Sequence, residues 1–203
     1  MKTDLPIIKG KGFIMDELKE SDYLEYYFMT CSFDNTKYLS FGPINSINEA
    51  RITLNCFYLN RKSLGLPSVY AIRKKLGGEM IGLIEYHTYY YNTNCAELGF
   101  MLREDFQHKG IMHKALKEMI RIGFQDLNLS KILVSYVDIN YASKKLIEDL
   151  GFKYESTRYG AFITHDTHEK RNIIYCSIYL EEYEVMLKDE DWFMVSQNNG
   201  YDD

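Results

Sequence analysis

The sequence has no long hydrophobic run, and this absence excludes a helical membrane anchor. No stretch of about 18 consecutive apolar residues occurs, so no helix is expected to cross a bilayer. The first residues, Met1-Lys2-Thr3-Asp4, also lack the apolar segment of a secretory signal peptide. The sequence therefore predicts a cytoplasmic protein without a membrane partner.

Cysteines are few, and their spacing does not suit a metal site. The four are scattered, so we expect reduced thiols in a cytosolic protein: Cys31, Cys56, Cys95 and Cys176. Neither a phosphate-binding Walker loop nor a Ser-His-Asp arrangement is visible in the sequence. These absences predict a protein with no bound metal.

The chain also lacks an excess of positive charge. It contains 24 Lys and Arg residues against 29 Asp and Glu residues, and the net charge is −5. This balance argues against a nucleic-acid partner and suits a cationic substrate such as an amine. The length of 203 residues predicts one domain, residues 1–203, with a sizeable core. Residues 181–203 form an acidic tail, and its Trp192 and Phe193 need cover that a homodimer would provide.

Hydrophobic periodicity predicts a mixed sheet flanked by helices, in the order β-α-α-β-β-β-α-β-α-β-β. Alternation places six of these seven strands over residues 12–18, 67–73, 79–89, 95–102, 132–137 and 174–180, and the next-to-last strand of the order has no assigned range. The strand over 132–137 is apolar at most positions, which is typical of a strand buried on both faces. The fold class is therefore α/β, with one parallel crossover between the fourth and fifth of these strands.

Four helices have identifiable starts or apolar faces. Ser21-Asp22 is expected to cap a first helix that ends at Phe28, and Ser46 with Glu49 forms the capping box of a second. The apolar stripe of the second helix is Ile47, Ala50, Leu54, Phe57 and Arg61. The stripe of the third is Ile111, Ala115, Met119 and Ile122, and that of the fourth is Ser143, Leu146, Ile147 and Leu150. These stripes are expected to pack on the sheet.

The segment from Gln107 to Met112 carries the strongest functional signal. It reads Gln107-His108-Lys109-Gly110-Ile111-Met112 and joins the strand over 95–102 to the third helix. The first N–H groups of a helix have no partner within it, so with the helix dipole they favour a phosphate. Gly110 has no Cβ and allows a ligand close to the backbone. The segment therefore predicts an anion site.

Two further motifs make the chain resemble the GNAT N-acetyltransferase superfamily. One is Asn140-Tyr141-Ala142-Ser143, and the other is Gly151-Phe152 after a short helix. The motif residues are most similar to those of the subgroup that acetylates the N-termini of ribosomal proteins. The resemblance is strongest from about residue 79 to 155. The resemblance implies one GNAT-like domain: a central, mostly antiparallel mixed sheet with a splayed parallel strand pair. It also implies an acetyl-CoA-dependent N-acetyltransferase whose acceptor is a primary amine, either a protein N-terminus or a small amine.

The resemblance also assigns roles to residues. Acetyl-CoA is implied to bind along the splayed strand, the loop and the next motif, through Phe100, Met101, Leu102, Gln107, His108, Lys109, Gly110, Ile111, Met112, Asn140 and Ser143. An N–H near Met101 would polarise the thioester carbonyl. Glu97 is the expected general base, with a carboxylate in a structural pair as the alternative. Asn140 is expected to contact the pantetheine arm, to cap the helix, or both.

Two positions depart from the family pattern. Ile147 stands where many members carry a tyrosine that protonates the thiolate, which leaves Ser143 as the nearest alternative acid. Phe162 stands where the ribosomal type carries an acidic residue, so a ribosomal acceptor does not follow from the motifs. The missing tyrosine also leaves open a second hypothesis, a catalytically silent module that binds acyl-CoA and regulates a partner. His87 and His113 are further candidates for proton transfer.

Overall fold

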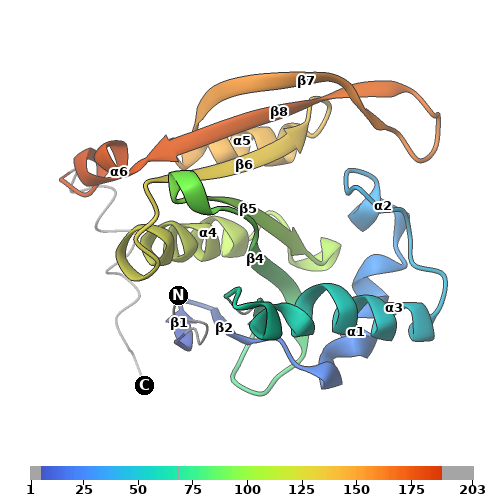
Figure 1. Cartoon of the computed structure of the whole chain (residues 1–203). Helices are drawn as coiled ribbons and strands as arrows, with labels where there is room; N and C mark the ends of the chain where they lie inside the picture. Colours follow the sequence, from blue (N-terminus) through green and yellow to red (C-terminus); the bar gives the residue numbers. More distant parts are fainter. Residues whose placement is uncertain (1–5, 68, 189–203) are drawn as a thin grey trace.

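The computed structural model describes residues 6–67 and 69–188. Its strands form one sheet in the order β1-β2-β3-β4-β5-β6-β8-β7 (Figure 1). The strands are β1 (Ile8–Gly10), β2 (Phe13–Glu17), β3 (Tyr70–Arg73), β4 (Met80–Tyr90), β5 (Cys95–Leu102), β6 (Lys131–Val137), β7 (Lys153–Ile163) and β8 (Lys170–Tyr179). The helices are α1 (Tyr23–Thr30), α2 (Phe33–Thr36), α3 (Ile47–Thr53), α4 (Ile111–Arg121), α5 (Tyr141–Asp149) and α6 (Leu180–Met186). This arrangement confirms the predicted fold class.

One strand pair is parallel, and it comes apart halfway along its length. β5 pairs with β6 from Cys95 to Leu98, opposite Lys131 to Val134, whereas every other neighbouring pair is antiparallel. Beyond Leu98, β5 continues to Leu102 against β4 alone. The two strands therefore separate as the resemblance implied, and one edge of β5 is left open.

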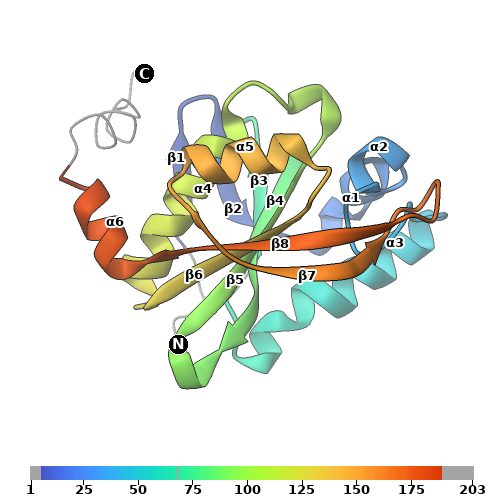
Figure 2. The ribbon, with the colours of Figure 1, turned by 90° about the horizontal axis from the view of Figure 1, so that it is seen from above.

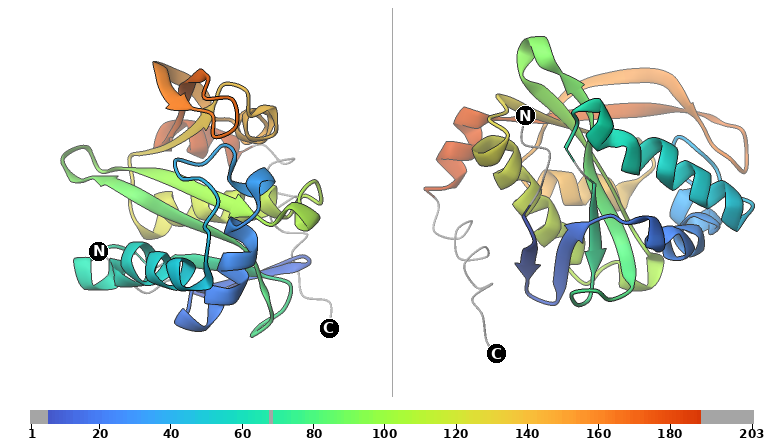
Figure 3. Two further views of the ribbon diagram at one scale, coloured as in Figure 1. Left: turned by 90° about the vertical axis from the view of Figure 1, so that its right-hand side faces the viewer. Right: turned by 60° about the horizontal axis from the view of Figure 1, so that its bottom comes forward.

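Helices cover both faces of the sheet, and each face has its own core (Figures 2 and 3). Ala96 and Leu98 of β5 point to the face that carries α4 and α5, where they join Ala115 and Met119. Met101 points to the other face, among buried residues of α1 and α3. Because side chains alternate along a strand, Glu97 lies on the same face as Met101. This alternation decides which helices surround the predicted base.

The two predicted helix caps had different outcomes. Asp22 is the N-cap residue of α1, as predicted, but its side chain caps no N–H of that helix, and α1 ends at Thr30 rather than at Phe28. A 3-10 helix over Glu20–Asp22 precedes α1, and the Asp22 carboxylate accepts hydrogen bonds from Arg73 at 2.7 and 2.8 Å. The cap at Ser46 is confirmed, because its Oγ accepts from the N–H of Glu49 at 3.1 Å. The Glu49 carboxylate returns to the N–H of Asn45 rather than to that of the cap residue, so the predicted box is shifted by one residue.

The helix that starts at Ser46 does not stay regular. α3 is followed by a π-helical turn over Leu54–Tyr58 and a 3-10 helix over Leu59–Leu64. Ala50, Leu54 and Arg61 are buried as predicted, whereas Ile47 is 44% and Phe57 is 70% exposed. The wider π turn rotates Phe57 away from the predicted stripe. The stripe was therefore correct for three of its five residues.

The C-terminal part corrects two further predictions. Leu180 is the first residue of α6 and not part of the last strand, which ends at Tyr179. Leu133 and Ser135 of β6 are only half-buried, because their face borders a cleft and not a helix. Glu181, Glu182 and Glu184 lie on α6, whereas Trp192 and Phe193 fall outside the described residues. Within residues 6–67 and 69–188, no helix has the length and apolarity needed to cross a membrane.

Candidate active site

A continuous cleft of about 1560 Å³ opens where β5 and β6 separate. We call its two parts the loop end and the acidic end. The loop end is lined by Gln107, His108, Gly110, Ile111, Met112, Asn140 and Ser143. The acidic end is lined by Asp34, Glu49, Tyr58, Arg61, Glu85, His87, Glu97 and Phe162. The cleft is also lined by Phe100, Met101 and Leu102 of β5. The edge of this strand therefore borders both the loop end and the acidic end.

At the loop end, the start of α4 has the geometry of an anion site. Gly110 precedes α4 with φ +73°, and His108 has φ +57°, a conformation that non-glycine residues adopt rarely and often at ligand sites. No side chain caps the helix, so its first N–H groups keep no partner of that kind. A Cβ built on Gly110 would meet no atom within 4 Å, which shows open space in front of the loop. These features fit the pyrophosphate of a coenzyme A thioester.

Two side chains of the loop hold the loop itself. Gln107 Nε2 donates to the carbonyl of Leu102 at 2.9 Å and ties the loop to the end of β5. Lys109 Nζ donates to the carbonyl of Asp105 at 2.6 Å and lies over the Phe106 ring. Lys109 is not among the residues that line the cleft. The contact of Lys109 with the coenzyme remains a prediction. In this structure its ammonium group lies at the Asp105 carbonyl and the Phe106 ring, away from the cleft.

The register of β4 and β5 decides which backbone groups face the open edge. The N–H of Arg103 donates to Ile81 at 2.8 Å, and antiparallel strands alternate between residues that point toward and away from the partner. By this alternation Met101 points its N–H toward β4, whereas Phe100 and Leu102 point theirs toward the gap beside β6. The bond from Gln107 to the carbonyl of Leu102 agrees with this assignment. The donors near Met101 are therefore those of its two neighbours.

The Asn140–Ser143 motif forms the first turn of α5. Asn140 Oδ1 accepts from the N–H of Ser143 at 3.1 Å, so the capping alternative is confirmed. Ser143 lies on the cleft wall, whereas Ile147, one turn later, is 0% exposed and packs in the core. The position that carries a tyrosine in many family members is thus a core position here, and it supplies no proton.

At the acidic end, Glu97 is 8% exposed and borders the cleft. Its Oε1 accepts a hydrogen bond from Ser135 Oγ of β6 at 2.7 Å and lies 3.8 Å from His87 Nε2 of β4. The carboxylate is therefore held between the strands on both sides of β5. It stands at the point where β5 loses its contact with β6.

A second carboxylate lies on the same face. Glu85 of β4 is 8% exposed, and its Oε2 lies 3.0 Å from Arg61 Nη1. Arg61 also donates to the carbonyls of Tyr86 and Pro67, so the guanidinium is fixed. Burial raises the pKa of Glu85 to about 7, and the positive charge of Arg61 lowers it only in part. The site therefore contains a buried carboxyl group that titrates near neutral pH.

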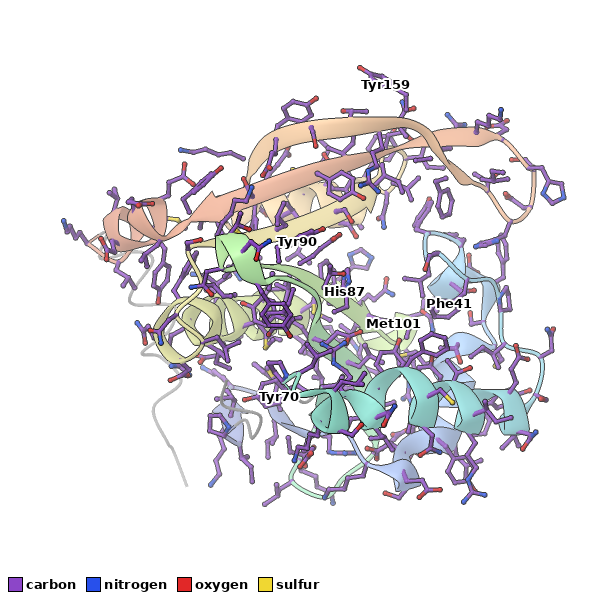
Figure 4. All side chains as sticks on the ribbon, in the orientation of Figure 1. Phe41, Tyr70, His87, Tyr90, Met101 and Tyr159 are labelled. Atoms are coloured by element: carbon purple, nitrogen blue, oxygen red, sulfur yellow. The ribbon has the colours of Figure 1, made fainter. Side chains whose placement is uncertain are left out.

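A contact between distant segments borders the acidic end. His165, in the turn between β7 and β8, places Nε2 3.1 Å from the carbonyl of Leu39, which follows α2. Phe162 is 7% exposed and meets the His165 ring edge-on, with centroids 5.8 Å apart. Phe162 stands where the ribosomal-protein acetyltransferases carry an acidic residue. Here this position is therefore part of an apolar wall. Figure 4 shows Phe41, from the same loop as Leu39, on the α2 side.

Sequence reasoning placed Glu97 and the loop end, but it missed most of the acidic end. Arg61 was expected in an apolar stripe, and Glu85 lies inside an apolar strand, where a charged residue is unusual. Each of these two charged residues interrupts an apolar pattern, and this could have indicated that they belong to the site. Ser135 carried no signal, because its role depends on the pairing of β5 with β6. Of the two candidate histidines, His87 lies beside Glu97, whereas His113 lines the cleft from α4.

Comparisons with known proteins agree with this geometry. The family model for the acetyltransferase (GNAT) domain matches residues 13–153. The chain is 29% identical over 140 residues to the uncharacterized N-acetyltransferase p20 of Bacillus licheniformis, which covers 68% of this chain and 76% of that protein. Among the described residues, no group of three or more His, Cys, Asp or Glu side chains is arranged to hold a metal ion.

Two solved structures share the fold. RimL, a ribosomal L7/L12 acetyltransferase solved with coenzyme A, has a TM-score of 0.76 at 17% identity, over 87% of this chain and 99% of its own. A spermidine N-acetyltransferase from Vibrio cholerae, solved with CoA and spermine, has a TM-score of 0.74 at 18% identity, over 85% and 98%. At these identities the likeness shows the fold alone. Since the family model matches more than half of the chain, the protein belongs to the GNAT acetyltransferase family, as its motifs predicted.

Proposed function

We propose that this acetyltransferase moves the acetyl group of acetyl-CoA directly to a primary amine that is positively charged at neutral pH. The observation that carries the proposal is the position of Glu97. Its buried carboxylate borders the cleft where β5 and β6 part, between the helix terminus at the loop end and the carboxylates at the acidic end. An ammonium group must lose a proton before it can attack, and a carboxylate at this place can accept it.

The loop end is proposed to hold the coenzyme. The N–H groups of residues 110–112 face the pyrophosphate, and the open edge of β5 pairs with the pantetheine amides as an added strand would. The N–H groups of Phe100 and Leu102 point toward the gap and are placed to polarise the thioester carbonyl. Acetyl-CoA supplies the activated acyl group. The protein supplies position, charge and proton transfer.

Proton transfer is proposed to use two residues. Glu97 accepts the proton of the ammonium group, and the free amine then attacks the carbonyl. Ser143 lies on the cleft wall in the first turn of α5 and is the proposed donor to the departing thiolate, since Ile147 cannot act. Its hydroxyl regains a proton from the attacking nitrogen, which loses its second proton as the tetrahedral intermediate collapses to the amide. Both assignments predict a direct attack with no acylated enzyme.

The charges of the acidic end support a cationic acceptor. Five acidic side chains line the cleft: Asp34, Glu49, Glu85 and Glu97 at the acidic end, and Glu104 in the turn after β5. The cations beside them are engaged, because Arg61 pairs with Glu85 and Lys37 pairs with Asp34. The contact between His165 and Leu39 narrows access, so the amine should sit on a slender chain. Both a polyamine and an extended protein N-terminus meet this description.

The test is amine-dependent release of free coenzyme A thiol. Purified protein is incubated with acetyl-CoA and a panel of primary amines: linear diamines, branched amines and short peptides with a free N-terminus. We expect turnover with slender cationic acceptors and none with N-trimethylated or N-acetylated controls, whose nitrogen cannot attack. Coenzyme binding without any amine-dependent thiol release would instead support the acyl-CoA-binding module. A cytoplasmic location and a homodimer remain predictions from the sequence.

A further inference from the structure

β4 is irregular where it passes Glu97. Its register against β5 runs from Tyr86 opposite Leu98 directly to Thr88 opposite Glu97, so His87 is the extra residue of a β-bulge. Before the bulge, Tyr86 points to the α4 face, where its hydroxyl donates to the carbonyl of Met119 at 2.6 Å. Because Thr88 pairs with Glu97, both His87 and Thr88 lie on the cleft side. The bulge therefore presents two successive polar residues to the carboxylate.

The missing side chain of Gly99 makes room for the His87 ring. A Cβ at Gly99 would lie 2.7 Å from His87 Cδ2, which is closer than real contacts allow. The imidazole is thus seated directly over the β5 backbone, two residues from Glu97. Figure 4 shows His87 beside the β4–β5 pair, near the centre of the molecule. Bulge and glycine together fix the ring at this place.

The two ring nitrogens have different surroundings. His87 Nδ1 lies 2.8 Å from Thr88 Oγ1, and Nε2 lies 3.8 Å from Glu97 Oε1. The side chain is 37% exposed, whereas that of Glu97 is 10% exposed. The histidine therefore lies between the buried carboxylate and the open cleft. The distance of 3.8 Å is closed by a small rotation of the ring or by one bridging water.

The groups around His87 favour a neutral ring. Burial and the charge of Arg61 lower its pKa, and Glu97 opposes them. Ser135 on β6 and Tyr175 on β8 also lie near this carboxylate, and Glu85 on β4 is paired with Arg61. A neutral imidazole whose Nδ1–H donates to Thr88 leaves Nε2 free to accept a proton.

We propose that His87 carries protons from Glu97 to solvent, an inference that rests on the proposed role of Glu97 as the base. After each attack the Glu97 carboxyl holds the proton of the ammonium group. His87 Nε2 takes this proton, and the resulting imidazolium releases a proton to water on its exposed side. One proton leaves per turnover, and both residues return to their starting states. No oxidant, metal or further reactant is needed.

Chemical rescue tests this relay. His87→Ala removes the imidazole and leaves a space over Gly99 that added imidazole can enter. We expect kcat to fall by about 10²-fold, the lower end of general acid–base effects, with an unchanged Kd for acetyl-CoA. Added imidazole should restore turnover in proportion to its neutral form, which a merely structural histidine would not show. His87→Asn is the second variant, in case the alanine variant is poorly folded, and melting temperatures are measured for both.

Two comparisons separate this relay from the proposed function. Gly99→Ala keeps the histidine but displaces its ring. It should therefore slow turnover and change the pH–rate profile in the same direction as His87→Ala does. Glu97→Gln should lose turnover and gain nothing from imidazole, because the base itself is absent. Parental turnover in a folded His87 variant, or a loss that imidazole does not reverse, overturns the relay alone. Parental turnover in Glu97→Gln overturns the proposed function.

Discussion

The two ends of the cleft are built in different ways. The loop end is built mainly by one continuous segment, residues 107–112, which presents backbone N–H groups at the start of α4, and Asn140 and Ser143 at the start of α5 complete it. The acidic end is made of side chains from α2, α3, the helical segment after α3, β4, β5 and β7. The first end depends on local backbone conformation. The second depends on how distant elements pack.

This difference suits the chemistry of the two ligands. A pyrophosphate is the same in every acyl-CoA, so a helix terminus that offers N–H groups is sufficient to bind it. An amine acceptor must be bound, oriented and deprotonated, which requires side chains at fixed positions. Variation among related acetyltransferases is therefore expected at the acidic end, and the following changes separate the two ends.

The largest effect is expected from Glu97→Gln at the acidic end. The substitution keeps the shape of the side chain and removes its basicity, so turnover should fall by about 10²- to 10⁴-fold while the Kd for acetyl-CoA stays constant. Turnover should recover in part at high pH, where free amine accumulates. Steady-state rates across pH measure both effects. A glutamate that only supports the fold would lower the melting temperature and leave the turnover of folded protein intact.

Glu85→Gln should change how stability depends on pH. Burial raises the pKa of Glu85 from its ordinary value of 4.5 to about 7, so ionisation is less favourable in the folded state. The parent protein should therefore lose stability as pH rises from about 4.5 through about 7, by up to about 3 kcal/mol. The glutamine variant lacks this loss, and urea unfolding at pH 5 and pH 8 measures the difference.

The control for this pH experiment is Glu79→Gln, because the Glu79 side chain is 53% exposed. It should follow the parent at both pH values. If Glu85→Gln instead becomes less stable relative to the parent as pH rises, the ion pair with Arg61 outweighs burial.

Acetyl-CoA should stabilise the folded protein through the loop end. A ligand that binds only the folded state adds about 2.7 kcal/mol at a hundredfold excess over its dissociation constant. A thermal melt with and without acetyl-CoA measures this increase, and free pantetheine, which lacks the pyrophosphate, should give a smaller one. A melting temperature that does not move at millimolar acetyl-CoA contradicts the assignment of the loop end.

A smaller effect is expected from Gly110→Asp. A carboxylate at this position faces the proposed phosphate site, so the affinity for acetyl-CoA should fall by about tenfold to a hundredfold, which corresponds to about 1–3 kcal/mol. Gly65→Asp is the matched control, because Gly65 has φ +71° and also has no atom within 4 Å of a built Cβ. Both variants carry the same backbone strain, but only the first should weaken binding. Equal affinities in calorimetry would place the phosphates elsewhere.

The sequence by itself determined most of the secondary structure and pointed to the loop end. Period-two and helical patterns are local, so β5 was predicted at its observed residues, Cys95–Leu102, and the apolar stripe that begins at Ile111 lies on α4. The short elements β1 and α2 were not predicted. The loop could be singled out because its proposed function depends on neighbouring residues and on the conformational freedom of Gly110. Capping was less certain, because a carboxylate such as Asp22 can serve a distant arginine instead of its own helix.

Only the tertiary structure decided the acidic end. Arg61 meets Glu85, and Ser135 meets Glu97, because strand order and register bring segments together that are far apart in the chain. The bulge at His87 depends on pairing between two strands, and no pattern within β4 alone specifies it. The rotation of Phe57 out of its stripe likewise follows from a π turn. Local propensity fixes which elements form, whereas the side chains that meet in the cleft are fixed by packing across the sheet.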